Sequence, residues 1–121
     1  MDESVEEAEI RIITEPITKA DAQIIGKHWY SELVKGVVDI EKNILALGGE
    51  YHMDANVILI AQGSAQANVW GFNIYPTRPS EKWIEFISLI NIRPAVGNTS
   101  MLVEDEEIQN KMRAIIETLI V

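Results

Sequence analysis

Apolar residues recur along the chain with two different periods, and the change of period separates helical from extended segments. Residues 10–14 form a short β-rich run that Pro16 closes, which predicts a first strand. Over residues 19–47 the apolar positions recur every three or four residues, which is the period of a helix. Gly26 allows this stretch to be one helix or two. We favour two, ended by the glycine pair at 48–49.

The rest of the chain predicts a hairpin and a terminal helix. Val57–Ala61 is a short apolar run that fits either a buried strand or part of a short helix capped by Asp54. Residues 68–75 and 82–93 are rich in β-branched and aromatic side chains and flank a proline-containing turn, which predicts an antiparallel hairpin. Residues 104–119 carry a single apolar stripe at helical spacing and predict the last helix.

These elements predict an α+β fold, a two-layer domain in which helices pack on a mainly antiparallel sheet. The chain has 121 residues, of which 47% are hydrophobic, so it can form one packed core. Residues 1–9 contain five acids and no base and predict a flexible acidic arm. Residues 10–121 show no internal repeat and no linker, which predicts a single domain.

The net charge of −9 is concentrated in two short stretches. Nine of the 19 acids lie in residues 1–9 and 104–107, and the other ten are balanced by the ten bases. No basic run is left to neutralise phosphates, so the sequence predicts no binding to nucleic acid or to an anionic membrane. The absence of cysteine excludes a disulfide framework and thiolate chemistry. No secretory signal or long apolar run is present, which predicts a cytoplasmic, soluble protein.

One candidate site follows the glycine pair. If residues 50–54 are extended, Glu50, His52 and Asp54 project to the same side, because alternate residues of a strand share a face. Such a row could ligate a divalent metal, or it could supply a general base with an orienting acid. The structural alternative is that Asp54 caps a turn and His52 lies on an exposed edge. No cofactor is predicted.

A second candidate site combines Arg93 with the loop of residues 97–100. Arginine offers a planar fork suited to phosphate or carboxylate, and the small loop residues could present backbone donors to an anion. Asn91, Asn98 and Ser100 are the further ligand-binding candidates. The structural alternative is an internal ion pair between Arg93 and one of three carboxylates, Glu85, Asp39 or Glu50.

Six short strings also carry a family resemblance. They are Val37-Val38-Asp39-Ile40, Gly48-Gly49-Glu50-Tyr51-His52-Met53-Asp54, Gln62-Gly63-Ser64, Val69-Trp70-Gly71-Phe72-Asn73, Leu89-Ile90-Asn91-Ile92-Arg93-Pro94 and Gly97-Asn98-Thr99-Ser100-Met101. In order and number they resemble a small uncharacterised prokaryotic family of unknown function, one domain long, over residues 10–120.

The resemblance implies a shared cluster but no activity. Its members would be Asp39, His52, Asp54, Asn91 and Arg93. Thr99 stands where the loop of that family usually has arginine. This departure removes a positive charge from the predicted anion site.

The sequence therefore leaves the function open between two classes. The leading hypothesis is a non-enzymatic cytoplasmic interaction module that acts as a homo-oligomer, because the strands have apolar faces and no strong catalytic motif is present. The alternative is a small hydrolase, or a protein that binds a small anionic ligand, using His52, Asp54 and Arg93, with or without a divalent metal. Asp39 is a further catalytic candidate. Whether the chain is an enzyme is not decided by its sequence.

Overall fold

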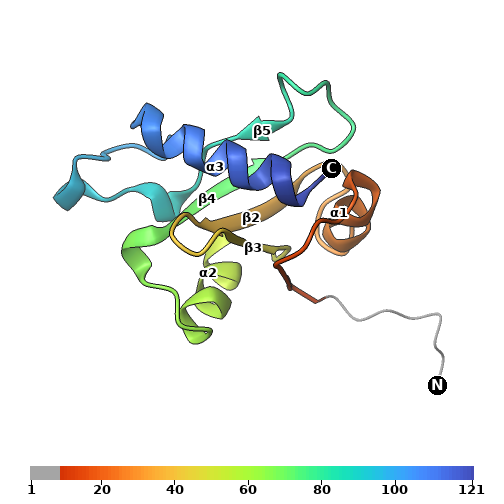
Figure 1. Cartoon of the computed structure of the whole chain (residues 1–121), viewed down its shortest axis with the longest axis horizontal. Coiled ribbons are helices and arrows are strands. Elements are labelled where there is room, and N and C mark those ends of the chain that lie inside the picture. The colour runs from red at the N-terminus through yellow and green to blue at the C-terminus, as the bar shows by residue number, and fades with distance from the viewer. Residues whose placement is uncertain (1–8) are drawn as a thin grey trace.

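The computed structural model describes residues 9–121, which form a five-stranded antiparallel sheet with three helices packed against it (Figure 1). The strands are β1 (Arg11–Ile13), β2 (Val34–Asp39), β3 (Ile44–Leu47), β4 (Val69–Ile74) and β5 (Ile84–Glu85). The helices are α1 (Lys19–Gly26), α2 (His52–Ala61) and α3 (Glu106–Leu119), and short 3-10 helices are η1 (Gln66–Asn68), η2 (Leu89–Asn91) and η3 (Pro94–Val96). The predicted α+β fold is thereby confirmed.

The strands lie in the order β1-β3-β2-β4-β5, so β2 is the central strand. The register places Val37 opposite Ala46 on one side and opposite Gly71 on the other. Alternate residues of the strands face the two sides of the sheet. One face, which carries Val38 and Phe72, packs against α1 and α3. The other face packs against α2, so helices cover both faces.

The prediction of one or two helices over residues 19–47 is wrong beyond Gly26. Helix α1 ends at Gly26, and residues 34–47 form the β2–β3 hairpin. Both faces of these strands are covered, so apolar residues occupy both and their spacing imitates a helix. The turn shows the local cause: Asp39 Oδ1 accepts hydrogen bonds from the backbone N–H groups of Glu41 and Lys42, and Asn43 adopts a positive φ of 59°.

The glycine pair 48–49 ends a strand and not a helix. Gly48 and Gly49 have φ values of +112° and +103°, a conformation that L side chains rarely adopt. They turn the chain from β3 directly into α2, which begins at His52. The alternative that the sequence left open for residues 57–61 is therefore resolved as helix.

The predicted hairpin forms, but its second strand is much shorter than residues 82–93. Only Ile84–Glu85 pairs with β4, and the chain then leaves the sheet through η2 and η3. The side-chain amide of Asn91 takes over beside β4: its Oδ1 accepts from Gly71 N at 2.8 Å, and its Nδ2 donates to Gly71 O at 3.0 Å. A side chain thus occupies the edge where a longer strand was expected.

The last predicted helix is confirmed as α3. Its N-cap residue is Asp105, whose carboxylate accepts from Glu107 N at 2.8 Å. The stripe of Met112, Ile116 and Leu119 packs on the sheet, and α3 lies across it in Figure 1. All but the last residue of the predicted arm 1–9 lies outside the described residues. Within residues 9–121, no helix has the length and apolar character needed to cross a membrane.

Candidate functional site

His52 is the first residue of α2, and its side chain turns inward onto β4. The ring is buried, and its Nε2 lies 2.8 Å from the carbonyl oxygen of Phe72. A carbonyl only accepts, so Nε2 carries the proton and Nδ1 is the acceptor of the neutral ring. Burial lowers the pKa of His52 to about 4, which outweighs the effect of Phe72 O and of the Asn73 side chain, both of which favour the charged ring. The folded protein therefore holds a neutral imidazole at pH 7.

A cavity of about 450 Å³ opens beside this ring. Its polar groups include His52, Lys35 and Asn73, and its walls are mainly apolar. Asn73 is 8% exposed and donates through Nδ2 to Glu85 Oε1 at 3.2 Å. Its Oδ1 is buried and has no hydrogen-bond partner among residues 9–121. Buried acceptors in native proteins nearly always have a partner, so this oxygen marks a place for a donor from outside the chain.

An exposed apolar surface surrounds the mouth of the cavity, and we call it the α2 surface. It consists of seven exposed residues: Tyr51, Met53, Val57, Ile60, Ile87, Leu89 and Met101. Five of them also line the cavity, while Val57 and Ile60 extend the stripe of Met53 along α2. Contiguous exposed apolar surface commonly marks a binding site. The surface and the cavity together form the candidate functional site.

Of the two carboxylates predicted beside His52, Asp54 has another partner. Asp54 Oδ2 accepts from Tyr51 N at 3.0 Å, so it stabilises the first turn of α2. Glu50 is exposed. His52 and Asp54 both lie in the first turn of α2, where residues two apart do not share a face, and Glu50 precedes the helix. Within residues 9–121, no group of three or more His, Cys, Asp or Glu side chains could hold a metal ion.

Asp39, the further catalytic candidate, is fully buried at the end of β2. Its Oδ2 accepts from Ser64 Oγ at 2.6 Å, and its Oδ1 accepts from the backbone N–H groups of Glu41 and Lys42 at 2.9 Å. These bonds tie the hairpin turn to the end of α2. Both carboxylate oxygens are engaged, which assigns Asp39 a structural position.

Arg93 lies over the start of β4 and binds backbone carbonyls. Its guanidinium donates to the carbonyl oxygens of Ala67 and Val69, and its Nε donates to Ile90 O. The same group stacks on the ring of Trp70, with Cζ 4.2 Å from the ring centroid. Burial lowers the pKa of Arg93. These contacts take the place of the ion pair expected from the sequence.

The loop at residues 97–100 is an anion site that the chain fills itself. Glu104 Oε2 accepts from the backbone N–H groups of Thr99 and Ser100 and from Ser100 Oγ at 2.7 Å. The hydroxyl of Ser100 contributes most to lowering the pKa of Glu104. The chemistry predicted for this loop is therefore present, but the anion is a carboxylate of the same loop.

The two asparagines of this region hold the loop together. Asn98 is buried, and its Nδ2 donates to Asn91 O at 2.8 Å and to Leu102 O at 2.9 Å. Its Oδ1 accepts from Glu104 N at 2.8 Å. Asn91, which is also bonded to Gly71, donates through Nδ2 to Met101 O at 3.1 Å. The side-chain bonds of both amides are thus made within the chain.

The structure separates the residues that the sequence grouped. His52 lines the cavity of the α2 surface, whereas Arg93 and Asn98 line a different cavity beside Trp70. Asp54 lines neither cavity. Sequence reasoning missed Lys35, Asn73 and Trp70. Asn73 carried a signal, since a polar residue within an otherwise apolar strand run needs a partner.

Fold and site together define a small α+β domain with an exposed apolar surface and a mainly apolar cavity that contains a few polar groups. The chain belongs to a family described as a protein of unknown function (DUF5674), whose pattern matches residues 11–119. This confirms the resemblance to an uncharacterised single-domain family. The family description assigns no activity. No curated protein and no solved structure matches the chain significantly.

Proposed function

We propose that this chain is a non-enzymatic cytoplasmic interaction module, and that two copies associate through the α2 surface. The observation that carries the proposal is the stripe of Met53, Val57 and Ile60, which faces solvent along α2. Met53 is 51% exposed and Val57 is 58% exposed. Aliphatic side chains in a continuous exposed stripe lose unfavourable contact with water when a second surface covers them.

Helix α2 is apolar on two opposite sides. Its inward side contains Ala55 and Leu59, which pack on the sheet with Val37. Its outward side carries the exposed stripe. A surface helix of a globular protein normally has one apolar side and one polar side, and a helix that is apolar all round is normally buried. Association of two copies would bury the outward side of α2.

The low charge of the α2 surface also favours contact with a second copy of this chain. Residues 51–61 contain one charged side chain, Asp54, and residues 87–101 contain one, Arg93, which binds backbone carbonyls. Two copies that each carry −9 repel one another, so they approach most easily through an uncharged surface. Two-fold dimers bring the same surface of both copies together and are the commonest oligomers.

Substitution of Val57 by glutamate tests this proposal. Sedimentation velocity of the whole chain should give twice the monomer mass for the wild type and the monomer mass for Val57→Glu. The matched control is Ile24→Glu, because Ile24 is a helix residue that is 47% exposed and lies on α1. Ile24→Glu should remain dimeric. A monomeric wild type at millimolar concentration, or equal dissociation of both variants, would overturn the proposal.

A second candidate function is binding of a small molecule in the His52 cavity. The unpartnered Oδ1 of Asn73 and the acceptor Nδ1 of His52 both require a hydrogen-bond donor. Cyclohexanol, which donates, should therefore shift the His52 ring resonances, whereas cyclohexanone, which cannot donate, should not. Equal shifts from both compounds, or none from either, would count against this second function.

A further inference from the structure

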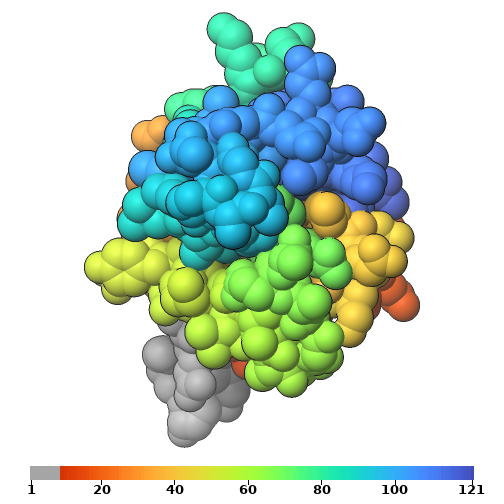
Figure 2. Space-filling view, turned by 90° about the vertical axis from the view of Figure 1, so that its left-hand side faces the viewer, coloured from red at the N-terminus to blue at the C-terminus, as the bar shows by residue number. Residues whose placement is uncertain are grey.

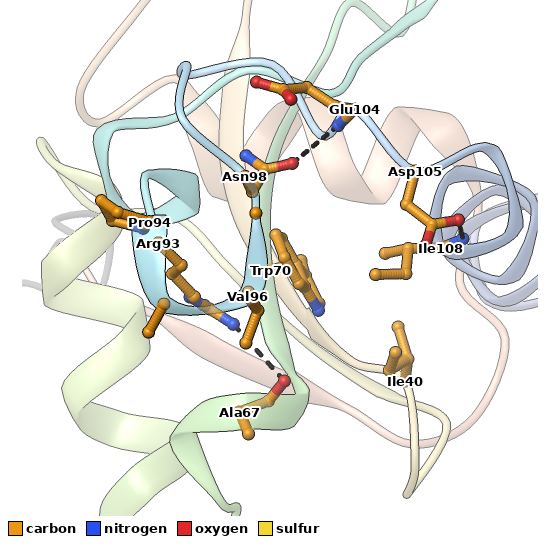
Figure 3. Close-up of a pocket in the computed structure, with 12 residues that line it drawn as sticks. Ile40, Ala67, Trp70, Arg93, Pro94, Val96, Asn98, Glu104, Asp105 and Ile108 are labelled. Atoms are coloured by element: carbon orange, nitrogen blue, oxygen red, sulfur yellow. Dashed lines mark hydrogen bonds between the residues drawn. The ribbon is translucent and has the colours of Figure 1, made fainter.

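A second, larger cavity of about 800 Å³ lies between the start of β4, the η3 loop and the start of α3. Its apolar walls come from Ile40, Ala67, Val96 and Ile108 (Figure 3). Figure 2 looks onto the face where the loop of residues 90–105 meets the green segment that contains η1. None of the seven residues of the α2 surface lines this cavity. It is therefore a separate candidate site.

The indole of Trp70 forms part of the cavity wall and has an unused donor. Trp70 is 3% exposed, and its Nε1 has no hydrogen-bond partner among residues 9–121. In Figure 3 the indole nitrogen is directed toward the side of the cavity occupied by Ile40 and Ile108, neither of which has a side-chain acceptor. A buried tryptophan N–H usually finds a partner, because burial without one sacrifices its hydrogen bond to water.

The other polar groups of the cavity wall are engaged, so they do not compete for the same ligand atom. Arg93 binds backbone carbonyls and stacks on one face of the indole, which holds the ring in place. Asn98 is bonded through both its oxygen and its nitrogen. A ligand that enters this cavity finds a fixed donor in Trp70, and a donor held in place binds with less loss of conformational freedom.

The charge of the rim restricts the ligand further. Glu104 and Asp105 are exposed and line the cavity. Hydrogen bonds, chiefly from Ser100 Oγ, lower the pKa of Glu104, so this carboxyl remains ionised near neutral pH. These two carboxylates outnumber Arg93, the one cation of the cavity lining, and its guanidinium is bound to backbone carbonyls, so the mouth disfavours an anionic ligand. The oxygen that reaches the indole should therefore belong to an uncharged group.

We propose that this cavity binds a small, mainly apolar organic molecule whose uncharged carbonyl oxygen accepts a hydrogen bond from Trp70 Nε1. A ketone, an ester and an amide share this chemistry. The apolar walls receive the hydrocarbon part of the molecule, and the indole N–H fixes its orientation. The site is independent of the association of two copies, because it shares no residue with the α2 surface.

The test uses two compounds of nearly the same shape, cyclohexanone and methylenecyclohexane, in which a C=CH2 group replaces C=O. The whole ¹⁵N-labelled chain shows its tryptophan indole N–H groups in a two-dimensional spectrum, and Trp70→Phe identifies the Trp70 signal. Cyclohexanone should shift that signal in a saturable way, with at least a tenfold lower Kd than methylenecyclohexane, and leave Trp29 and Trp83 unchanged. No saturable shift, equal shifts from both compounds, or equal movement of all three signals would overturn the proposal.

A cavity-filling variant separates this site from binding elsewhere. Ala67→Phe places a ring against the cavity wall and should abolish the saturable shift of Trp70. Ala20→Phe is the matched control, because Ala20 is exposed on α1 and lines no part of the cavity. Retained binding in Ala67→Phe would contradict the assignment. If that variant does not fold, Ala95→Leu on the same wall makes the same comparison.

Discussion

His52 shows how one buried residue links the candidate site to the stability of the fold. Its ring enters the interior from the first position of α2 and donates to a carbonyl of the neighbouring strand β4. Because burial lowers its pKa to about 4, the folded chain resists a proton that the unfolded chain accepts near 6.5. The neutral ring is thus part of the packing between α2 and the sheet.

The stability of the wild type should fall as the pH is lowered from 6.5 toward 4. Unfolded chains take up a proton at His52 in this interval and folded chains do not, so the contribution is complete above 6.5 and is lost on acidification. The full interval corresponds to roughly 3 kcal/mol, at about 1.4 kcal/mol per pKa unit. Urea unfolding of the wild type and His52→Gln measures this contribution. Parallel pH profiles of the two proteins would contradict it.

Replacement of Arg93 by lysine should destabilise the chain by about 1–3 kcal/mol, although the charge is kept. Lysine cannot reach three carbonyls in a fixed fork, and it lacks the planar group that stacks on Trp70. The matched control is Arg78→Lys, since Arg78 is exposed and its guanidinium lies 3.6 Å from the ring of Tyr75. Urea unfolding should show a change within about 0.5 kcal/mol for the control. Equal effects of both substitutions would refute the role assigned to Arg93.

At the residue scale, the sequence predicted the anion chemistry of residues 97–100 but not the anion. Small loop residues with free backbone donors are a local feature, so they are visible in the sequence. Glu104 belongs to an acidic run that also looks like a helix start, and nothing local distinguishes its carboxylate from its three acidic neighbours. Only the fold of the loop, closed by Asn98, brings that carboxylate to Ser100.

At the scale of the elements, η2 packs closely against β4 because Gly71 has no side chain. A Cβ added to Gly71 would lie 2.5 Å from Ser88 Cβ and 3.1 Å from a side-chain carbon of Ile90. This approach lets the amide of Asn91 reach both backbone groups of Gly71. Glycine is therefore required here because a side chain would not fit. Its backbone conformation does not require glycine, since its φ is not positive.

Gly71→Ala should push η2 away from the sheet and destabilise the chain by about 1–3 kcal/mol, the usual range for overpacking. Adding Ser88→Gly removes the nearest atoms and should recover part of the loss. Thermal unfolding of the two single variants and the double variant gives the coupling between the positions. If the stability losses of the two single variants simply add in the double variant, the close contact with Ser88 is not the reason for glycine at position 71.

Helix α3 was predicted correctly because only one of its faces is covered, whereas β4, with all six residues buried, was recognised from its β-branched and aromatic side chains. Helix α3 has a single apolar stripe and an acidic first turn, so its pattern excludes a strand. Residues 34–47 have both faces covered, and Val37 and Val38 are both buried on opposite sides of β2. Such a pattern lacks the period of two on which strand prediction depends. The missing information is which faces the rest of the chain covers.

For the whole molecule, the distribution of charge decides how two copies can meet. The net charge is −9, while the α2 surface contains no charged residue. Long-range repulsion between copies opposes association, and short-range burial of apolar side chains favours it. These two contributions respond differently to salt.

Raising sodium chloride from about 0.1 M to about 1 M should strengthen the dimer, because the screening length falls from about 10 Å to about 3 Å. Repulsion between the copies is then screened, while the contact between α2 surfaces persists. Sedimentation equilibrium at several salt concentrations measures the change in Kd. A dimer that weakens with salt would indicate an interface held by ion pairs, and not by the seven uncharged residues of the α2 surface.

The central claim is that the α2 surface of one copy touches the α2 surface of another. A mixed sample of ¹³C-labelled and unlabelled chains tests this by isotope-filtered NOEs, which report contacts between copies only. Met53 and Met101 lie on the α2 surface, and the fully buried Met112 is an internal control. We predict intermolecular NOEs from the methyl groups of Met53 and Met101 and none from Met112. A sample of confirmed dimer mass without NOEs from Met53 or Met101, or a monomer at millimolar concentration, would contradict the account.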